Sequence, residues 1–383
     1  MDTAAEPTAS AERAALLYVS DDAPGYSRRR KGSGFIFFDG HGSVVRKHSL
    51  LSRFRALRIP PAWRNFWIGS DTDCHMQATG RDSRGRKQYI YHPQWNEIRN
   101  STKFDRLVPC ASALPSIRER VDRDLRRMAF SRNAVLAFVV ALLEATLTRI
   151  GNREYARQND SFGLTTLRNH HISIAGSLLQ LKFRGKRGKF HEIDIRNRRL
   201  ARLARKYQEL PGQELLKYED EPGSFKAIGS GDVNQYLKDI SGSDFTAKDF
   251  RTWGGTVFAA GELYRAGPAE STADGKRKIS RALKRTAAKL GNTATVCRKH
   301  YVASQVIESY LNGTLFPAMS RPESSNGKPF DLTPEEKAVA GVLRGADGPR
   351  RQDENLNPSA LHVRAVKKTM GDGYGIGQKF LEG

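Results

Sequence analysis

The hydrophobic pattern of the chain changes near residues 103–107, and this change limits the folds that the chain can adopt. Before it, the chain has short alternating segments, such as residues 35–38 (FIFF) and 88–91 (QYIY), next to glycine-containing turns. These features are typical of strands. After it, apolar side chains recur at helical spacing. The sequence therefore predicts an α+β fold, with a small β-rich N-terminal domain over residues 1–105 and a mainly helical domain over residues 106–319.

A β-hairpin is predicted inside the helical domain. Apolar residues alternate over residues 179–183 and again over 190–195, and the turn between them (GKRG, residues 185–188) is basic and flanked by glycines. Helices are expected at residues 200–207, 247–264, 279–290 and 295–311. Pro, Gly, Asn, Ser and Arg predominate over residues 320–383, which predicts a mobile tail with one short helix at residues 334–344.

The longest apolar run, residues 134–143, is predicted to form a buried helix rather than a membrane anchor. It lies between Arg132 and Glu144 and is far shorter than the roughly 20 residues that span a bilayer. The N-terminus has neither a basic start nor an apolar stretch, so no secretory signal is expected. The three cysteines are widely separated, which argues against a disulfide framework and a zinc site and favours a reducing cytoplasm. They are Cys74, Cys110 and Cys297.

The charge of the chain indicates a polyanionic partner. Lys plus Arg number 64 and Asp plus Glu number 41, which gives a net charge of +23. Nucleic acid is the usual partner of so basic a protein. The sequence has no phosphate-binding P-loop pattern, which disfavours a nucleotide-hydrolysing motor. The acidic run Glu219-Asp220-Glu221 is interpreted as a solvated loop, so neither a metal site nor a cofactor is predicted.

Arg149, Lys186, Arg251 and Tyr301 could together cut a phosphodiester bond. Tyrosine is a weak nucleophile at neutral pH because its phenol titrates near ~10. Cations around a phosphate would favour the phenolate and stabilise the charge of the transition state. Each residue also has an ordinary structural interpretation: a packed helical tyrosine, a solvated turn lysine, or an arginine at a helix end or surface. Their occurrence as an ordered set favours a role in catalysis.

The order and surroundings of these four residues resemble those of the short type IB DNA topoisomerases of poxviruses and bacteria. The resemblance extends over roughly residues 25–315. Its strongest stretches are residues 80–92 (GRDSRGRKQYIYH), 148–167 (TRIGNREYARQNDSFGLTTL), 183–186 (FRGK), 248–253 (KDFRTW) and 291–301 (GNTATVCRKHY). It implies two domains that close as a clamp around duplex DNA. It also implies a tyrosine that cuts one strand, a 3′-phosphotyrosyl bond with a free 5′-hydroxyl, strand swivelling, and religation without ATP or metal.

The resemblance further implies roles for individual residues. Tyr301 would be the nucleophile, Lys186 would protonate the leaving 5′ oxygen, and Arg149 and Arg251 would hold the nonbridging oxygens of the phosphate. The position of a histidine in the wider family is occupied here by Asn292. Its amide can donate a hydrogen bond to a phosphate oxygen but cannot transfer a proton. If the position must transfer a proton, the enzyme would be crippled. The bacterial members that this chain resembles often carry asparagine there, so the resemblance favours Asn292 as a hydrogen-bond donor.

Contacts with DNA are expected from both domains. The candidates are Lys87, Gln88, Tyr89 and Tyr91 in the N-terminal domain, and Tyr155 and Lys248 in the helical domain. They supply phosphate-binding cations, a base-edge amide and aromatic rings. Tyr89 and Tyr91 share one face of a strand, so they could instead pack against each other. The expected partner is duplex DNA, bound by a monomer in a bacterial cytoplasm and associated with the nucleoid.

Two other functions are consistent with these patterns. Tyrosine recombinases use a related catalytic set, but they usually carry His-x-x-Arg around the second arginine, whereas this chain has Lys248-Asp249-Phe250-Arg251. They also lack the signature at residues 80–92. A non-catalytic DNA-binding protein would need only the basic charge. It would bind DNA in a salt-sensitive manner and form no covalent adduct.

Overall fold

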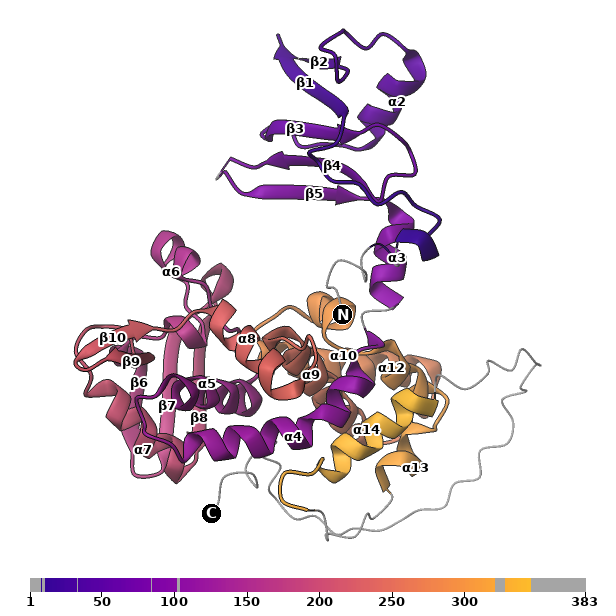
Figure 1. Cartoon of the computed structure of the whole chain (residues 1–383). Coiled ribbons are helices and arrows are strands. Elements are labelled where there is room, and N and C mark those ends of the chain that lie inside the picture. Colours follow the sequence, from indigo (N-terminus) through magenta and orange to yellow (C-terminus); the bar gives the residue numbers. More distant parts are fainter. Residues whose placement is uncertain are drawn as a thin grey trace. The chain divides into compact units, whose positions relative to one another are not determined.

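The fold is an antiparallel sheet followed by a mainly helical body, which confirms the predicted α+β class (Figure 1). The structure is a computed structural model that describes Thr8 and residues 11–32, 34–83, 85–101, 104–320 and 328–345. The chain divides after Asp105 into two compact units, here called the N-terminal unit and the C-terminal unit.

The N-terminal unit is built on a five-stranded antiparallel sheet with strand order β2-β1-β3-β4-β5. Its strands are β1 (Gly25–Lys31), β2 (Gly34–Phe38), β3 (Arg64–Gly69), β4 (Met76–Arg81) and β5 (Lys87–Tyr91), and its helices are α2 (His48–Ala56) and α3 (Pro93–Ser101). Phe54 of α2 packs with Phe37, Ile68 and Ala78 of the sheet, and the Phe37 and Phe54 rings lie 4.9 Å apart. Burial of these apolar side chains attaches α2 to the sheet.

The core of the C-terminal unit is the helix α5. Residues 134–143 are at most 6 % exposed, so the prediction of a buried helix is confirmed. The helix packs against its neighbours α4, α8 and α9. The four helices are α4 (Leu107–Leu125), α5 (Arg132–Thr146), α8 (Ser230–Ser241) and α9 (Ala247–Ala266). Within the described ranges, no helix has both the length and the hydrophobicity needed to cross a membrane.

The predicted hairpin is present as part of a three-stranded sheet with order β6-β7-β8. Its strands are β6 (Ile172–Ala175), β7 (Leu178–Arg184) and β8 (Phe190–Arg196), and a short 3-10 turn, η4 (Lys186–Gly188), joins β7 to β8. The interpretation of residues 219–221 as a loop was wrong. They lie in β9 (Lys217–Glu221), which pairs with β10 (Ser224–Ala227), and Asp220 forms an ion pair with Lys226 across the two strands.

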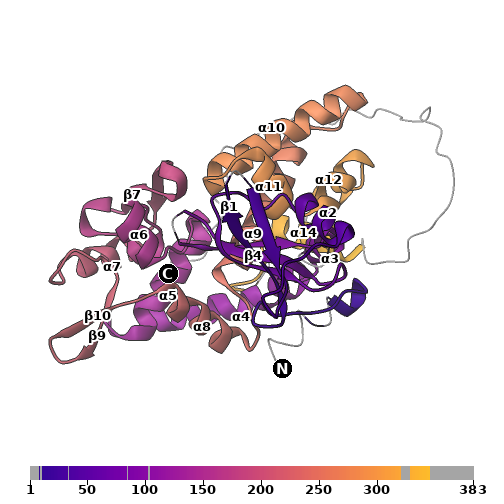
Figure 2. The ribbon, with the colours of Figure 1, turned by 90° about the horizontal axis from the view of Figure 1, so that it is seen from above.

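The helix predicted over residues 295–311 is two helices, α11 (Ala294–His300) and α12 (Ser304–Leu311) (Figure 2). Tyr301 lies at the break between them. Val302 and Ala303 are buried, and the Ala303 N–H donates to Thr256 Oγ1 at 3.3 Å rather than to a helical carbonyl. This tertiary contact ends the helical periodicity. The remaining elements are α6 (Arg153–Asn159), η2 (Leu164–Thr166), η3 (Asn169–His171), α7 (Arg198–Gln208), α10 (Thr272–Leu290), α13 (Leu315–Ser320) and α14 (Pro334–Gly345).

The prediction of a mobile tail from residue 320 is wrong for α14. This helix packs against α4, α9, α12 and α13, and its apolar residues Val339, Ala340 and Leu343 are buried. The helix therefore belongs to the body of the C-terminal unit, because its apolar face is covered. Residues 321–327 and 346–383, which the same prediction covers, lie outside the described residues.

A buried ion-pair network ties α14 to the core. Arg118 of α4 is 4 % exposed and lies between Glu144 of α5 and Glu336 of α14, at 2.6 Å and 2.7 Å. Replacing Arg118 by methionine is expected to lower the free energy of unfolding by about 3–5 kcal/mol, because the buried carboxylate of Glu336 and the partly buried carboxylate of Glu144 lose their partner. Urea unfolding followed by circular dichroism measures this loss of stability. As a control, Arg123→Met breaks the exposed Arg123–Glu119 pair and is expected to cost no more than about 0.5 kcal/mol. Equal losses in both variants would contradict this account.

Candidate active site

Arg149 lies just beyond the end of α5. The helix ends at Thr146, and Leu147 adopts the left-handed conformation, with φ of 55°. The Thr148 N–H then donates to the Thr146 side chain at 3.1 Å. Arg149 thus lies beyond the last residue of the helix, although the long apolar run before it predicts a helix that ends at Arg149. It follows the left-handed residue Leu147, which ends the helix.

The backbone at Arg149 is held by a close approach of two segments. The Arg149 carbonyl accepts a hydrogen bond from the Leu164 N–H at 2.9 Å. A Cβ atom on Gly163 would lie 2.5 Å from the Arg149 carbonyl oxygen and 2.6 Å from the Gly151 nitrogen. Only glycine fits at residue 163 without displacing this backbone. The segment of residues 148–167, part of the family resemblance, is thus a scaffold for Arg149.

Arg251 is buried on α9 and faces Tyr301. It is 4 % exposed, and its guanidinium donates to the carbonyls of Leu147 and, at 3.0 Å, Leu290. Its Cζ lies 5.2 Å from the centroid of the Tyr301 ring. Burial lowers the pKa of Arg251 to about 10, opposed by its attraction to Tyr301. The side chain is therefore still a cation at neutral pH, and its Nε has no hydrogen-bond partner among the described residues.

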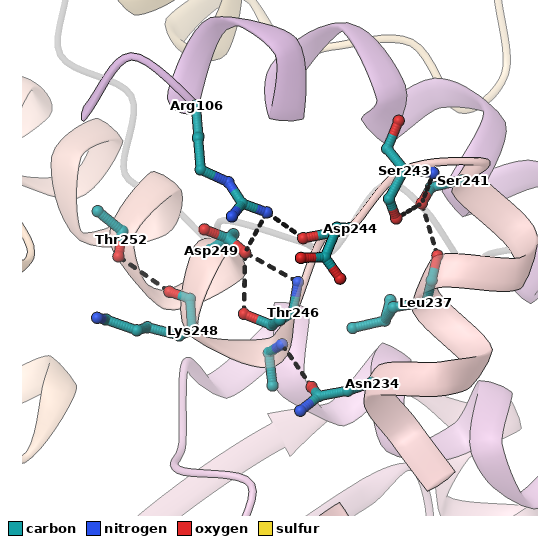
Figure 3. A network of polar contacts seen from close by, with 11 residues as sticks. Arg106, Asn234, Leu237, Ser241, Ser243, Asp244, Thr246, Lys248, Asp249 and Thr252 are labelled. Atoms are coloured by element: carbon teal, nitrogen blue, oxygen red, sulfur yellow. Dashed lines mark hydrogen bonds and ion pairs between the residues drawn. The ribbon is translucent and has the colours of Figure 1, made fainter. Parts of the chain in front are cut away.

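A polar network holds the first turn of α9 (Figure 3). The backbone N–H and the hydroxyl of Thr246 both donate to Asp249 Oδ2, at 2.8 Å and 2.9 Å. Arg106 binds the Asp244 carbonyl and lies 3.7 Å from Asp249. The exposed side chain of Lys248 extends away from this cluster (Figure 3). The network fixes the start of the helix that carries Arg251, and it leaves the Lys248 ammonium directed toward solvent.

Asn292 presents an unused donor beside Arg149. Arg149 donates to the Asn292 Oδ1 and, at 3.2 Å, to the Gly291 carbonyl. A guanidinium only donates, so the amide oxygen must face it and the Nδ2 group must point elsewhere. That buried Nδ2 has no hydrogen-bond partner within the part of the chain that the structure describes. Its neighbour is the thiol of Cys297, a weak acceptor. Because a thiol accepts so weakly, the Asn292 amide can still donate to an anion.

Tyr301 is half-buried at the C-terminal end of α11, and α9 positions it. Its carbonyl accepts from Thr256 Oγ1 at 3.3 Å. A Cβ atom on Gly255 would lie 2.8 Å from this carbonyl oxygen, so α9 needs glycine at this point of contact. The Tyr301 ring packs against a cluster that includes Leu290 and Cys297. The phenol is thus placed on a break between two helices, beside Arg251.

Lys186 is exposed at the tip of the β7–β8 hairpin. The tip is closed by a hydrogen bond from the Gly185 N–H to the Lys189 carbonyl, at 2.7 Å. Lys189, for which the sequence predicts no role, reaches the Asn292 carbonyl with its ammonium at 3.4 Å. The structure therefore brings Arg149, Arg251, Asn292 and Tyr301 together, and it attaches the Lys186 hairpin to them through Lys189.

Two of the DNA-contact candidates in the N-terminal unit are already engaged with carboxylates. The ammonium of Lys87 lies 2.6 Å from Asp21 Oδ2, and this pairing raises the pKa of Lys87. Gln88 Nε2 donates to Asp82 at 3.0 Å. The prediction of Lys87 as a simple phosphate-binding cation is thus incomplete. A phosphate would have to compete with Asp21, an acidic residue that lies far from Lys87 in the sequence.

The aromatic candidates are exposed to different degrees. Tyr89 is 46 % exposed and stacks on Tyr91, with ring centroids 5.7 Å apart and 6° between the planes. They therefore do pack against each other, as the alternative interpretation expected, while Tyr89 still offers ring surface to solvent. Tyr155 is 41 % exposed on α6. No cluster of three or more His, Cys, Asp or Glu that could hold a metal ion occurs among the described residues.

Residues 92–314 match the family model described as the catalytic core of eukaryotic DNA topoisomerase I. The chain belongs to the type IB DNA topoisomerase family. Residues 34–82 match a second family model, the N-terminal domain of bacterial DNA topoisomerase IB. The two matches cover most of the β sheet in the N-terminal unit and all of the elements that carry the candidate catalytic residues.

Viral members of the type IB topoisomerase family align over much of the chain. DNA topoisomerase 1B of Acanthamoeba polyphaga mimivirus is 33% identical over 317 residues, which is 80% of this chain and 93% of the viral protein. DNA topoisomerase 1B of vaccinia virus (strain Copenhagen) is 24% identical over 245 residues, 63% of this chain and 74% of the viral protein. DNA topoisomerase 1 of rabbit fibroma virus (strain Kasza) is 27% identical over 233 residues, 60% of this chain and 70% of the viral protein.

Proposed function

We propose that this type IB topoisomerase relaxes supercoiled duplex DNA through a transient bond between Tyr301 and one DNA strand. The observation that supports this proposal most directly is that two cations, Arg149 and Arg251, and the Asn292 amide lie around the tyrosine. Arg251 Cζ lies 5.2 Å from the Tyr301 ring centroid. Arg149 donates a hydrogen bond to Asn292 Oδ1, and the Nδ2 of the same amide can donate to a phosphate oxygen. Such an arrangement suits a phosphate with two nonbridging oxygens beside the phenol.

In the proposed reaction the Tyr301 phenolate attacks the phosphorus, and the bond from phosphorus to the 5′ oxygen breaks. Lys186 transfers a proton to that oxygen, which leaves as a hydroxyl. The products are a 3′-phosphotyrosyl ester and a strand end that can swivel. Religation is the reverse reaction: the 5′-hydroxyl returns its proton to Lys186 and attacks the phosphorus, and the Tyr301 phenolate leaves. One phosphodiester replaces another, so closure needs no ATP.

The arginines and Asn292 have separate proposed tasks. Arg149 and Arg251 stabilise the charge that develops on the nonbridging oxygens, which forked guanidinium donors do better than a lysine ammonium. Asn292 adds a hydrogen bond from Nδ2. The main cause of the lowered pKa of Arg149 is burial, so it is a poorly hydrated cation that gains from meeting a phosphate. Residues 1–105 and 106–319 are proposed as the DNA-binding and catalytic domains.

All five proposed catalytic residues come from one chain, which supports action as a monomer on duplex DNA. The Lys87 to Tyr91 strand, Tyr155 and Lys248 are proposed to contact the backbone or base edges. Cys74, Cys110 and Cys297 are buried free thiols, which supports a reducing, DNA-containing compartment such as a bacterial cytoplasm.

Relaxation of a supercoiled plasmid is expected to proceed in EDTA without any nucleotide, because protein cations occupy the positions where other enzymes place a metal ion. The plasmid should have arbitrary sequence, since site-restricted activity would indicate a recombinase. Agarose gels resolve the topoisomers, and a denaturing gel of the stopped reaction reveals the covalent adduct. Loss of relaxation in EDTA that magnesium restores would contradict the proposal. Tight DNA binding with no adduct would instead support the non-catalytic alternative.

A further inference from the structure

His191 lies next to the candidate catalytic residues, although the sequence predicts no role for it. It is on β8, where it pairs with Phe183 of β7. The two rings are stacked, with centroids 4.9 Å apart and 8° between their planes. Phe183 is buried. The stacking holds the imidazole flat against the hairpin, a few residues from the tip that carries Lys186.

Two glycines leave the space that this ring occupies. A Cβ atom on Gly185 would lie 2.7 Å from both the Cδ2 and the Nε2 of His191. A Cβ atom on Gly291 would lie 2.8 Å from the same Nε2. Gly185 precedes Lys186, and Gly291 precedes Asn292. The imidazole is therefore in contact with the backbone of the hairpin tip on one side and with the turn that carries Asn292 on the other.

The charge state of His191 is suited to this place. Burial, together with the nearby cations Arg149, Lys189 and Arg251, lowers its pKa to about 4. At neutral pH the ring is thus uncharged, and it adds no repulsion to a site that already holds several cations. A second contact acts between the same two segments, because the Lys189 ammonium reaches the Asn292 carbonyl at 3.4 Å. The hairpin and the turn are joined by both contacts.

We infer that His191 is a positioning residue: its flat ring spaces the hairpin against the Gly291–Asn292 turn, so that Lys186 reaches the leaving 5′ oxygen. His191 acts through Lys186 and does not itself contact the reacting atoms. This inference rests on the proposed function, in which Lys186 is the general acid. It predicts that loss of the ring harms the proton-transfer step and leaves the attack by Tyr301 intact.

The test compares two duplexes that differ in one atom. In one, the scissile phosphate has its normal 5′ oxygen; in the other, sulfur replaces that oxygen, and a thiolate leaves without needing a proton. His191→Ala is expected to slow single-turnover cleavage of the oxygen duplex by about 10- to 100-fold, the typical effect of a misplaced catalytic group. On the sulfur duplex it is expected to cleave at nearly the wild-type rate. Equal slowing on both duplexes, or no slowing on either, would overturn the inference.

Two further variants test whether the shape of the ring matters, and whether any substitution on β8 slows cleavage. His191→Phe keeps a flat, uncharged ring and is expected to cleave the oxygen duplex much faster than His191→Ala; cleavage as slow as that of the alanine variant would contradict the spacer role. Glu192→Ala is the matched control on the same strand, because it removes only the exposed Lys182–Glu192 pair. It is expected to cleave both duplexes like the wild type, and slowing on the oxygen duplex alone would show that any change in β8 has this effect.

Failure of this inference can be told apart from failure of the proposed function. If Lys186→Ala is not rescued by the sulfur duplex, the general-acid role of Lys186 fails, and the proposal for His191 fails with it. If Lys186→Ala is rescued while His191→Ala is not, the proposed reaction stands and only the role of His191 is overturned. In the expected result, both alanine variants are rescued, and the double variant cleaves the oxygen duplex no more slowly than Lys186→Ala alone.

Discussion

Replacing Tyr301 with phenylalanine is expected to abolish plasmid relaxation and covalent adduct formation, with a loss of more than about 10⁴-fold in rate, as for other enzymes that lose their nucleophile. The substitution removes one hydroxyl and keeps the ring. The ring contacts with Leu290 and Cys297 and the position over Arg251 should therefore persist. DNA binding should be retained, because the cations that attract the phosphates are unchanged.

The measurements are plasmid relaxation, adduct detection on denaturing gels, and DNA binding at fixed salt. Tyr218→Phe is a suitable control. Tyr218 lies on β9, and its ring is 6.0 Å from the Arg132 guanidinium, so a phenylalanine there should support full activity. Relaxation that survives in Tyr301→Phe would show that another group forms the bond. Loss of DNA binding in that variant would show that its inactivity does not report on the nucleophile.

Replacing Lys186 with alanine is expected to slow cleavage of a normal duplex by about 10²- to 10⁴-fold, the usual contribution of a general acid. The physical reason is the poor leaving group: an alkoxide without a proton donor leaves slowly. A duplex with sulfur at the 5′ bridging position should largely restore the rate. Single-turnover cleavage of the two duplexes measures this rescue, because it isolates the chemical step from strand swivelling.

Substitutions of two nearby lysines test whether the loss of any positive charge on the hairpin would slow cleavage as Lys186→Ala does. Lys182 of β7 forms an exposed ion pair with Glu192 of β8, so Lys182→Ala should have little effect on the cleavage rate. Lys189 contacts the Asn292 carbonyl, and Lys189→Ala is expected to slow cleavage less than Lys186→Ala does. If Lys189→Ala were the slower variant and also the one that sulfur rescues, the proton would come from Lys189 and the assignment of Lys186 would be wrong.

Much of the fold could be read from local patterns. The α+β class, the buried helix over residues 134–143 and the hairpin around Lys186 all follow from periodicity and turn residues, which depend on neighbours in the sequence. The helix predicted over residues 295–311 is a case in which local periodicity gave the wrong boundaries. Its apolar spacing continues through Tyr301, but the contact between Thr256 and Ala303 ends the first helix. A contact of that kind joins distant parts of the chain and leaves no periodic signal.

The candidate site was predicted only in part, for the same reason. The basic and glycine-rich contexts of Arg149, Lys186 and Arg251 are local and could be recognised. In the sequence, His191 is only one of the polar residues that alternate with apolar ones over residues 190–195. Its environment depends on Gly291, which is separated from it by several helices and approaches only in the folded chain. The pairing of Lys87 with Asp21 is another contact that sequence spacing cannot predict.

The sequence by itself determined the net charge, the types of the main elements, and the order of the candidate nucleophile and candidate cations along the chain, because these depend on residue type and local periodicity. Only the tertiary structure decided that Arg251 is buried beside Tyr301, that the Asn292 amide nitrogen is left unpaired, and that α14 is joined to the core through Arg118. These features depend on contacts between segments that are far apart in the sequence. Such contacts decide which side chains are buried and which buried polar atoms find hydrogen-bond partners. Neither property belongs to any single stretch of the chain.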